Sequence, residues 1–252
     1  MPVQAITRAT HILQAVGKMP ETPTPLKTIA AQTGLNPATC ARILQTLVRE
    51  GMIEQAERRQ GYTLGPMLYA LAGQGSYRRD LVETAKPHML RLAANTGTTV
   101  LLAVLHENRR YSICRADGAD TETFHPDVWA VESPYRSLTG RILLAHTIGD
   151  THEWVAKNGL PGDLWPEVRD ADSLAHQLAR LKHQSFCVTE ETPTHLSALA
   201  TPIFRGRTVV AALGLYLPTY KYTGERRESI ENDFPRTGNA ISGDLSMRDM
   251  TR

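Results

Sequence analysis

The sequence of 252 residues predicts an α+β protein with two domains. Apolar residues follow helical spacing through most of the chain up to Thr96, and from Thr98 the spacing changes to that of β-strands. Strands, helices and strands then follow one another in blocks before a final helix. This block order is typical of helices packed on an antiparallel sheet and not of a parallel βαβ sheet.

Two expected helix starts with the same pattern of residue types lie on either side of a short turn near the N-terminus. Thr24-Pro25 and Asn36-Pro37 each join a side chain that can cap a helix to a proline that suits the first helical position. Gly34 lies where the first helix must end and the chain must turn. Two short helices joined by a tight glycine turn predict a helix-turn-helix, with residues 36–51 as the helix that enters a DNA major groove.

The flanking segments favour this interpretation over an ordinary helical hairpin inside an all-helical core. Residues 53–64 alternate in character and carry the polar tip Arg58-Arg59-Gln60-Gly61, which predicts a hairpin with a basic tip. Upstream, apolar residues from Ala5 to Val16 supply the third helix that a small core needs. We therefore predict a winged helix-turn-helix DNA-binding domain over residues 1–65.

The candidate base-reading residues lie on the face of the second helix that is away from its apolar stripe. Arg42 could bind a guanine edge and Gln45 an adenine edge, whereas Thr39 and Arg49 suit phosphate contacts. A solvated surface is the alternative for both arginines. The candidate DNA contacts are Thr24, Asn36, Thr39, Arg42, Gln45, Arg49, Arg58 and Arg59.

The charge distribution agrees with DNA binding. Residues 1–65 hold seven basic and four acidic side chains, a net charge of +3, and the remaining residues carry −1. Positive charge therefore gathers in the part that would contact phosphates. Because +3 is too small for tight non-specific binding by one chain, we expect a dimer.

Composition indicates a globular protein in a reducing compartment. Hydrophobic residues make up 41% of the chain and charged residues 21%. No apolar run approaches the ~20 residues of a membrane span, and the N-terminal segment lacks the features of a signal peptide. Cys40, Cys114 and Cys187 are expected to be buried free thiols. We therefore expect a cytoplasmic protein that has no membrane partner.

A linker helix is predicted over residues 66–80 and a second domain over residues 81–252. Met67, Leu68, Tyr69 and Leu71 of the linker could form a dimer interface or could pack against their own domain. In the second domain, strands are expected at 98–105, 111–115, 120–131, 186–189, 197–204 and 209–217.

Helices are expected at 81–96, 138–145, 150–157, 173–183 and 223–245. Pro87 is expected to kink the first of these helices, and Pro235 to break or kink the last. Ser137 and Asp172 are the expected caps of the helices that follow them. An α+β domain of this kind suits a sensor that holds a small molecule between a sheet and its covering helices.

The chain resembles the IclR-type transcriptional regulators over nearly its whole length. The similar segments, in the order typical of the family, are LKTIAAQTGLNPATCARILQTLVREGMIEQ, GYTLGPMLYALA, PHMLRLAANTGTTVLLAVLHENRRYSI, SLTGRILLA and LATPIFRGRTVVAALGLYLP. The resemblance implies a winged helix-turn-helix, a linker helix and a GAF/PAS-like effector domain. It also implies a dimer, or a dimer of dimers, that controls catabolic or transport genes in response to a small and often anionic metabolite.

Departures from the family pattern affect both sites. The Lys-Ser-Thr-Val-His-Arg run typical of the recognition helix is replaced by residues 37–42, in which only Thr39 and Arg42 match. The operator sequence can therefore differ from those of relatives. In the second domain, the resemblance implies effector contacts at Ser137, Leu138, Thr139, Val188, Thr189, Ala198, Gly214 and Tyr216.

The acidic, cysteine and serine anchors typical of the family are mostly absent from these effector positions. A two- or three-carbon acid is therefore disfavoured, and a larger ligand could use Tyr216 for stacking or through its hydroxyl. Core packing is the alternative for Tyr216. Arg136 precedes the helix start at Leu138 and could pair with a ligand carboxylate or phosphate, and is preferred over Arg141, which could do the same but lies one turn into the helix, where pointing to solvent is the alternative.

The sequence carries no motif typical of enzymes. It lacks a G-x-S-x-G motif, a phosphate-binding loop, a dinucleotide fingerprint and any paired His or Cys metal spacing. We therefore expect no catalytic residues, cofactor or metal. An enzyme with a dispersed site is a remote alternative.

The predicted function is ligand-responsive regulation of transcription, as a repressor or an activator. The expected partners are double-stranded DNA with an inverted-repeat operator, a small organic metabolite and other copies of the chain, in a homodimer or tetramer. Ligand binding would change the spacing of two recognition helices on DNA, which must match a helical turn of ~34 Å. A sensor whose degenerate helix-turn-helix serves only protein contacts remains an alternative, because Pro37, Ala38 and Ala41 replace typical DNA contacts.

Overall fold

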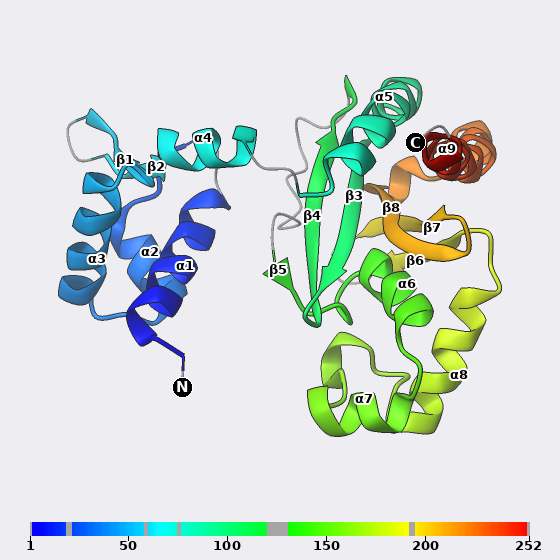
Figure 1. Cartoon of the computed structure of the whole chain (residues 1–252), viewed down its shortest axis with the longest axis horizontal. Helices are drawn as coiled ribbons and strands as arrows, with labels where there is room; N and C mark the ends of the chain where they lie inside the picture. The colour runs from blue at the N-terminus through cyan, green and yellow to red at the C-terminus, as the bar shows by residue number, and fades with distance from the viewer. Residues whose placement is uncertain are drawn as a thin grey trace. The chain divides into compact units, whose positions relative to one another are not determined.

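Figure 1 shows the computed structural model, which describes residues 2–18, 22–57, 60–74, 77–119, 131–191 and 195–250. The chain folds as two compact units, residues 1–77 and 78–252. Each unit is built around a hydrophobic core of its own.

Three helices and a two-stranded hairpin make up most of the first unit. They are α1 (Gln4–Gly17), α2 (Leu26–Thr33), α3 (Pro37–Arg49), β1 (Ile53–Gln55) and β2 (Tyr62–Leu64). Ile12, Ile29 and Leu44, one from each helix, are fully buried and pack in one cluster with Ile53 of the hairpin. The predicted winged helix-turn-helix is confirmed.

The turn between α2 and α3 follows the sequence prediction. Gly34 ends α2 in the left-handed conformation, with a φ of 64° that glycine adopts without steric cost. Asn36 caps α3, because its side-chain oxygen accepts a hydrogen bond of 2.9 Å from the Ala38 amide. Pro37 occupies the first helical position. Local sequence therefore determines where α3 begins.

The predicted capping role of Thr24 is wrong. Helix α2 begins at Leu26 without a side-chain cap. Thr24 instead bridges to the hairpin, through two hydrogen bonds of 2.9 and 3.0 Å between its backbone and that of Tyr62. The chain approaches so closely here that a Cβ at Gly61 would lie 2.8 Å from the Thr24 backbone. This bridge holds Thr24 extended and buries its side chain.

Helix α4 (Pro66–Gln74) follows the hairpin and has no buried residue. Its start is tied to the first unit by the Met67 amide, which donates a hydrogen bond of 3.0 Å to the Gly51 carbonyl. Met67, Tyr69 and Leu71 are 43, 72 and 55% exposed. Apolar side chains therefore remain uncovered on this helix within the described chain.

A six-stranded sheet in the order β5-β4-β3-β8-β7-β6 forms the centre of the second unit, and all neighbouring strands are antiparallel. The strands are β3 (Thr99–His106), β4 (Arg109–Ala116), β5 (Val131–Glu132), β6 (Cys187–Glu191), β7 (Leu196–Arg205) and β8 (Thr208–Pro218). The predicted antiparallel sheet is confirmed. Most of the strand predicted at 120–131 lies outside the described residues.

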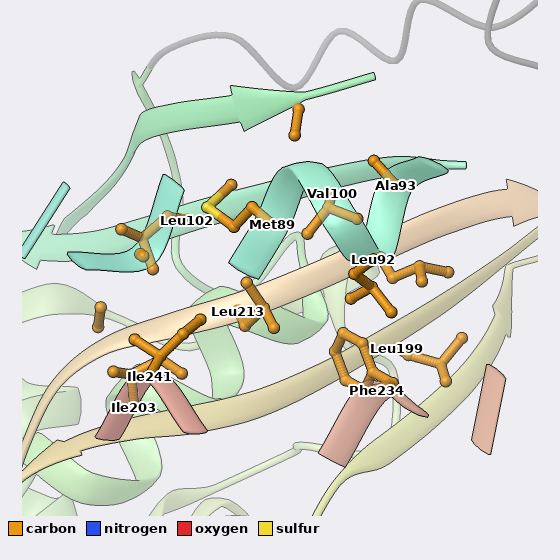
Figure 2. Packing of buried hydrophobic residues seen from close by; sticks show 14 of the residues in the cluster. Met89, Leu92, Ala93, Val100, Leu102, Leu199, Ile203, Leu213, Phe234 and Ile241 are labelled. Carbon is orange, nitrogen blue, oxygen red and sulfur yellow. The ribbon is translucent and has the colours of Figure 1, made fainter. Parts of the chain in front are cut away.

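Helices cover both faces of this sheet (Figure 1). The helices are α5 (Arg79–Thr96), α6 (Leu138–Thr147), α7 (Thr151–Asn158), α8 (Ala171–Lys182) and α9 (Gly224–Met250). On one face, Met89 of α5 and Phe234 of α9 pack with strand residues such as Leu102 of β3 in one buried cluster, which Figure 2 shows. On the other face α6 packs on the sheet, and α7 and α8 pack with it.

Two further expectations about the helices need correction. Helix α9 is continuous through Pro235, so the expected break there is wrong; Phe234 and Ile241 are both fully buried in the core between this helix and the sheet. Helix α8 is capped by Asp170 and not by Asp172. The Asp170 carboxylate accepts a hydrogen bond of 2.7 Å from the Ser173 amide, and the Ser173 hydroxyl accepts one of 3.0 Å from the Asp170 amide.

The three cysteines are free thiols, as predicted, although Cys114 is only half-buried. Burial raises the pKa of Cys187 to about 11. Burial also raises the pKa of Cys40 and of Cys114. Because the thiolate is the reactive form, none of the three is activated as a nucleophile.

The buried position of Phe234 makes a testable prediction about the second unit. Substitution Phe234→Ala should lower the free energy of unfolding by about 3–5 kcal/mol, because it removes a ring from a close-packed site. Chemical denaturation, followed by hydrogen exchange of the β3 and β8 amides, would measure this. Leu90→Ala is the control, since Leu90 is exposed on α5 and should cost less than about 0.5 kcal/mol. Equal effects of the two substitutions would contradict the described packing of α9.

Candidate nucleic-acid interface and effector site

Helix α3 separates a buried stripe from an exposed polar face. Cys40, Leu44 and Leu47 are buried in the core of the first unit. Arg42 and Gln45 are exposed on the opposite face. The helix has 13 residues, hence roughly 20 Å of length, and can lie in a major groove. Its exposed face therefore offers a guanidinium and an amide where base edges would be.

The other predicted DNA contacts differ in how accessible their side chains are to DNA. Arg49 is exposed and lies 3.4 Å from the Glu50 carboxylate, a surface pair of little energetic weight. Thr39 is half-buried, and Asn36 is exposed although its side-chain oxygen caps α3. The side chain of Thr24 is 1% exposed and cannot reach DNA, so that prediction is wrong. Arg58 and Arg59 lie outside the described residues.

Thr46 was missed by the sequence analysis and belongs to the same exposed face. Its side chain is exposed, and its hydroxyl donates a hydrogen bond of 3.1 Å to the Arg42 carbonyl. Its position four residues after Arg42 is the signal that could have identified it, because residues so spaced are neighbours on a helix.

The start of α6 lies directly on the sheet of the second unit. Ser137 caps the helix as predicted, and its hydroxyl accepts a hydrogen bond of 3.3 Å from the Gly140 amide. Thr139 is fully buried. A Cβ at Gly214 of β8 would lie 2.6 Å from the Thr139 methyl carbon, so only glycine fits there without movement. The predicted contacts Thr139 and Gly214 are thus brought together.

Three more predicted effector residues lie on the same face of the sheet. Thr189 of β6 is opposite Ala198 of β7, which is opposite Tyr216 of β8. Directly opposed residues of antiparallel strands point to one face. Ala198 and Tyr216 are buried and form a small cluster with Leu101 of β3. Side chains from four strands therefore meet beside the start of α6.

Other predicted effector residues lie elsewhere. Val188 is 39% exposed and is opposite Leu199, which packs in the core under α9, so strand alternation directs Val188 to the wrong face. Leu138 is buried in the core between α6 and the sheet. Arg136 is exposed on the turn before α6.

Arg141 does not point to solvent. Its guanidinium donates hydrogen bonds of 2.8 and 2.7 Å to the carbonyls of Tyr135 and Leu164, and lies 4.5 Å from the Trp165 ring centroid. These contacts tie α6 to the loop that precedes α8, so Arg141 has a structural role.

Arg110 of β4 is a residue that the sequence analysis missed. It is fully buried, and its Nε donates a hydrogen bond of 3.0 Å to the Thr139 hydroxyl. Arg115, on the same strand, is opposite Leu101 and donates a hydrogen bond of 2.6 Å to Asp117. The alternation of side chains along β4 could have indicated that Arg110 is buried. An arginine beside a turn, however, is normally taken to be solvent-exposed.

Neither a metal-binding cluster nor a membrane-spanning helix occurs in the described part of the chain. No group of three or more His, Cys, Asp or Glu side chains there could hold a metal ion. None of the described helices has the length and apolar character needed to cross a membrane.

Two family models match the chain. The model described as Bacterial transcriptional regulator IclR C-terminal matches residues 76–243, and the IclR helix-turn-helix domain matches residues 5–57. The regulator BhcR of Paracoccus denitrificans is 24% identical over 98% of this chain and 88% of its own length. The Glycerol operon regulatory protein of Streptomyces coelicolor is 26% identical over 84% of each chain.

Solved structures agree with these matches. An IclR regulator from Alicyclobacillus acidocaldarius is 25% identical with a TM-score of 0.71, over 98% of this chain and 100% of that one. An IclR homologue from Microbacterium hydrocarbonoxydans, complexed with 4-hydroxybenzoate, has the same fold, with 23% identity and a TM-score of 0.71 over 96 and 99% of the two chains. The members named here are transcriptional regulators and not enzymes. Because the C-terminal model alone matches more than half of it, the chain belongs to the IclR family of bacterial transcriptional regulators, with a DNA-binding unit followed by an effector-binding unit.

Proposed function

We propose that this regulator acts as a homodimer in which two copies of α3 read an inverted-repeat operator, and that its second unit binds a small organic effector beside the start of α6. The observation that carries the DNA-binding half is the exposed pair Arg42 and Gln45, opposite the buried stripe of α3. Thr39 and Arg49 then serve as phosphate contacts, and Arg58 and Arg59 as contacts from the hairpin. The protein works in the cytoplasm, where its operator lies.

The proposed effector is an aromatic or similarly large carboxylic acid. Tyr216 and Leu101 supply apolar surface next to the polar groups of Ser137, Thr139 and Thr189. Arg110 brings positive charge to the same sheet face, and a guanidinium favours a carboxylate. The Microbacterium relative binds 4-hydroxybenzoate, a ligand of this size and charge. Arg136 is a further candidate at the edge of the site, because it precedes Ser137.

Helix α4 is the proposed contact between two copies. A helix without a single buried residue and with exposed Met67, Tyr69 and Leu71 gains stability when a second apolar surface covers it. The effector would favour one arrangement of the two subunits, and this arrangement sets the distance between the two α3 helices. Relatives include the Glycerol operon regulatory protein and an Acetate operon repressor, so catabolic genes are the proposed targets.

The function can be tested by incubating the full chain with sheared genomic DNA at moderate salt and sequencing the bound fragments. Enrichment of a few intergenic fragments that contain an inverted repeat supports the proposal and identifies the regulated genes. Uniform binding or no binding, with and without a panel of aromatic acids, would favour a helix-turn-helix that serves only protein contacts.

Arg42→Ala should reduce the preference for the operator over random DNA by about 1–3 kcal/mol, because it removes one bidentate base contact. Fluorescence anisotropy with both DNAs at one salt concentration measures the ratio. Arg49→Ala is the matched control, and should weaken binding to both DNAs alike. An unchanged ratio for Arg42→Ala would show that Arg42 does not read a base.

Gly214→Ala should impair the response to the effector while DNA binding without effector is retained. The added methyl would lie 2.6 Å from the Thr139 side chain and would displace the start of α6. Thermal shift with a panel of aromatic acids, including 4-hydroxybenzoate, is the measurement. Gly243→Ala in α9 is the control, since a Cβ there meets nothing within 4 Å. If both variants respond like the parent chain, the effector does not bind at this position.

Leu71→Asp combined with Met67→Asp should shift the protein from dimer towards monomer, because both charges would be buried at the proposed α4 contact. Sedimentation velocity over a range of concentrations measures this shift. Glu83→Lys on α5 is a control, since Glu83 is exposed in the second unit. A dimer of unchanged strength in the α4 variant would exclude α4 from the interface.

A further inference from the structure

A pocket of about 590 Å³ lies in the second unit, away from the residues assigned to the effector. The turn between β3 and β4, the end of α6 and one side of α7 line it, and it is open to solvent. Its polar lining comes from Glu107 and Asn108 of the turn, and from Asp150, Glu153, Lys157 and Asn158 at α7. It is thus large enough for a small organic molecule.

The charges around this pocket favour a cation. Three carboxylates and one ammonium group line it, which gives a net charge of −2. Neither Glu107 nor Glu153 forms an ion pair in the described part of the chain. Helix α6 also ends here at Thr147, and the carbonyl end of a helix attracts positive charge.

An anion is disfavoured because the amide groups at the start of α7 are already occupied. The Asp150 carboxylate accepts hydrogen bonds of 2.7 Å from the His152 amide and 3.0 Å from the Glu153 amide. Hydrogen bonds from the Glu153 and His152 amides lower the pKa of Asp150, so it is charged at neutral pH. The positive end of α7 is therefore neutralised by its own cap.

The side-chain oxygen of Asn108 is a hydrogen-bond acceptor that receives no hydrogen bond in the described structure. Its amide nitrogen donates a hydrogen bond of 2.7 Å to the Asn158 side-chain oxygen, and the Asn158 amide nitrogen donates one of 3.0 Å to the Trp154 carbonyl. These two bonds fix the orientation of both amides. The Asn108 oxygen is consequently left buried without a hydrogen-bond partner in the described structure. A buried acceptor is stabilised when a ligand N–H reaches it.

Trp154 adds a fixed aromatic side chain to the lining. Its indole N–H donates a hydrogen bond of 2.8 Å to the Tyr135 hydroxyl, which donates one of 3.1 Å to the Gly159 carbonyl. An indole ring held in this way provides a surface that attracts an ammonium group at little cost in side-chain entropy.

We propose that this pocket binds a small aliphatic amine in its ammonium form, as a second ligand besides the effector. The ammonium N–H groups would bond to the Asn108 oxygen and to the carboxylates of Glu107 and Glu153. A metal ion suits the site less well, because the described residues contain no cluster that could coordinate one. The proposal does not depend on which effector binds beside α6 or on the operator.

Isothermal titration of the full chain with putrescine in 150 mM salt tests the proposal, with 1,4-butanediol as an uncharged probe of the same length. We expect saturable binding of putrescine, no binding of the diol, and at least a tenfold weaker affinity in the double variant Glu107→Gln and Glu153→Gln. Both residues are exposed, so the variant should keep the thermal stability of the parent chain.

Glu167→Gln is the matched control, because Glu167 is exposed and lies outside the pocket. It should leave putrescine binding unchanged. Absence of putrescine binding, equal binding by the double variant, or equal binding of the diol would each overturn the proposal. Titration with calcium chloride distinguishes an inorganic cation from an amine as the ligand. Binding of calcium but not of putrescine would show that the carboxylates hold an inorganic cation, and would overturn the proposal.

Discussion

The close contact between α6 and β8 is the constraint on which the second unit depends. The sheet face under α6 is lined by Ala103, Ala200, Ala212 and Gly214, whereas the opposite face of the same strands carries leucines. Small residues let a helix approach a sheet closely, and at Gly214 the approach leaves no room even for a methyl group. The small size of these residues therefore sets the position of α6, and both proposed ligand sites take their shape from this helix.

The local elements were predictable because their causes are local. Asn36 and Ser137 cap the helices that follow them, as each one's neighbours in the sequence indicate. The strands of the second unit follow from alternation and from apolar runs, and the antiparallel arrangement follows from their order. For the two caps, hydrogen bonds within a few residues determine the outcome.

Three of the errors have a common cause in contacts between residues that are far apart in sequence. Thr24 has the composition of a cap, but its backbone is held by Tyr62, and no pattern near residue 24 indicates that bridge. Pro235 favours a break, but the buried side chains of Phe234 and Ile241 keep α9 continuous. The residue type of Val188 does not indicate which face of the sheet it lies on. Only its register with Leu199 reveals this face.

Arg110 shows why sequence reasoning found only some of the residues that the structure brings together at the proposed effector site. Arg110 lies in one of the segments that resemble the family, but the effector positions that the resemblance implied did not include it. Its location follows from two independent facts, the β3–β4 register that places it opposite Leu105 and the hydrogen bond to Thr139. Because a buried guanidinium has a strong requirement for acceptors, its contact with Thr139 couples β4 to the start of α6.

This contact also relates the two proposed ligand sites of the second unit. Helix α6 has 10 residues and spans about 15 Å, with Ser137 at the effector end and Thr147 at the pocket end. Arg110 is two residues from Asn108, so the same turn that lines the pocket leads into the strand that holds Thr139. Helix α6 and the first residues of β4 therefore connect the proposed effector site with the pocket. If an amine and an effector favour different positions of α6, each must change the affinity of the other by the same factor, because coupling between two binding sites is reciprocal.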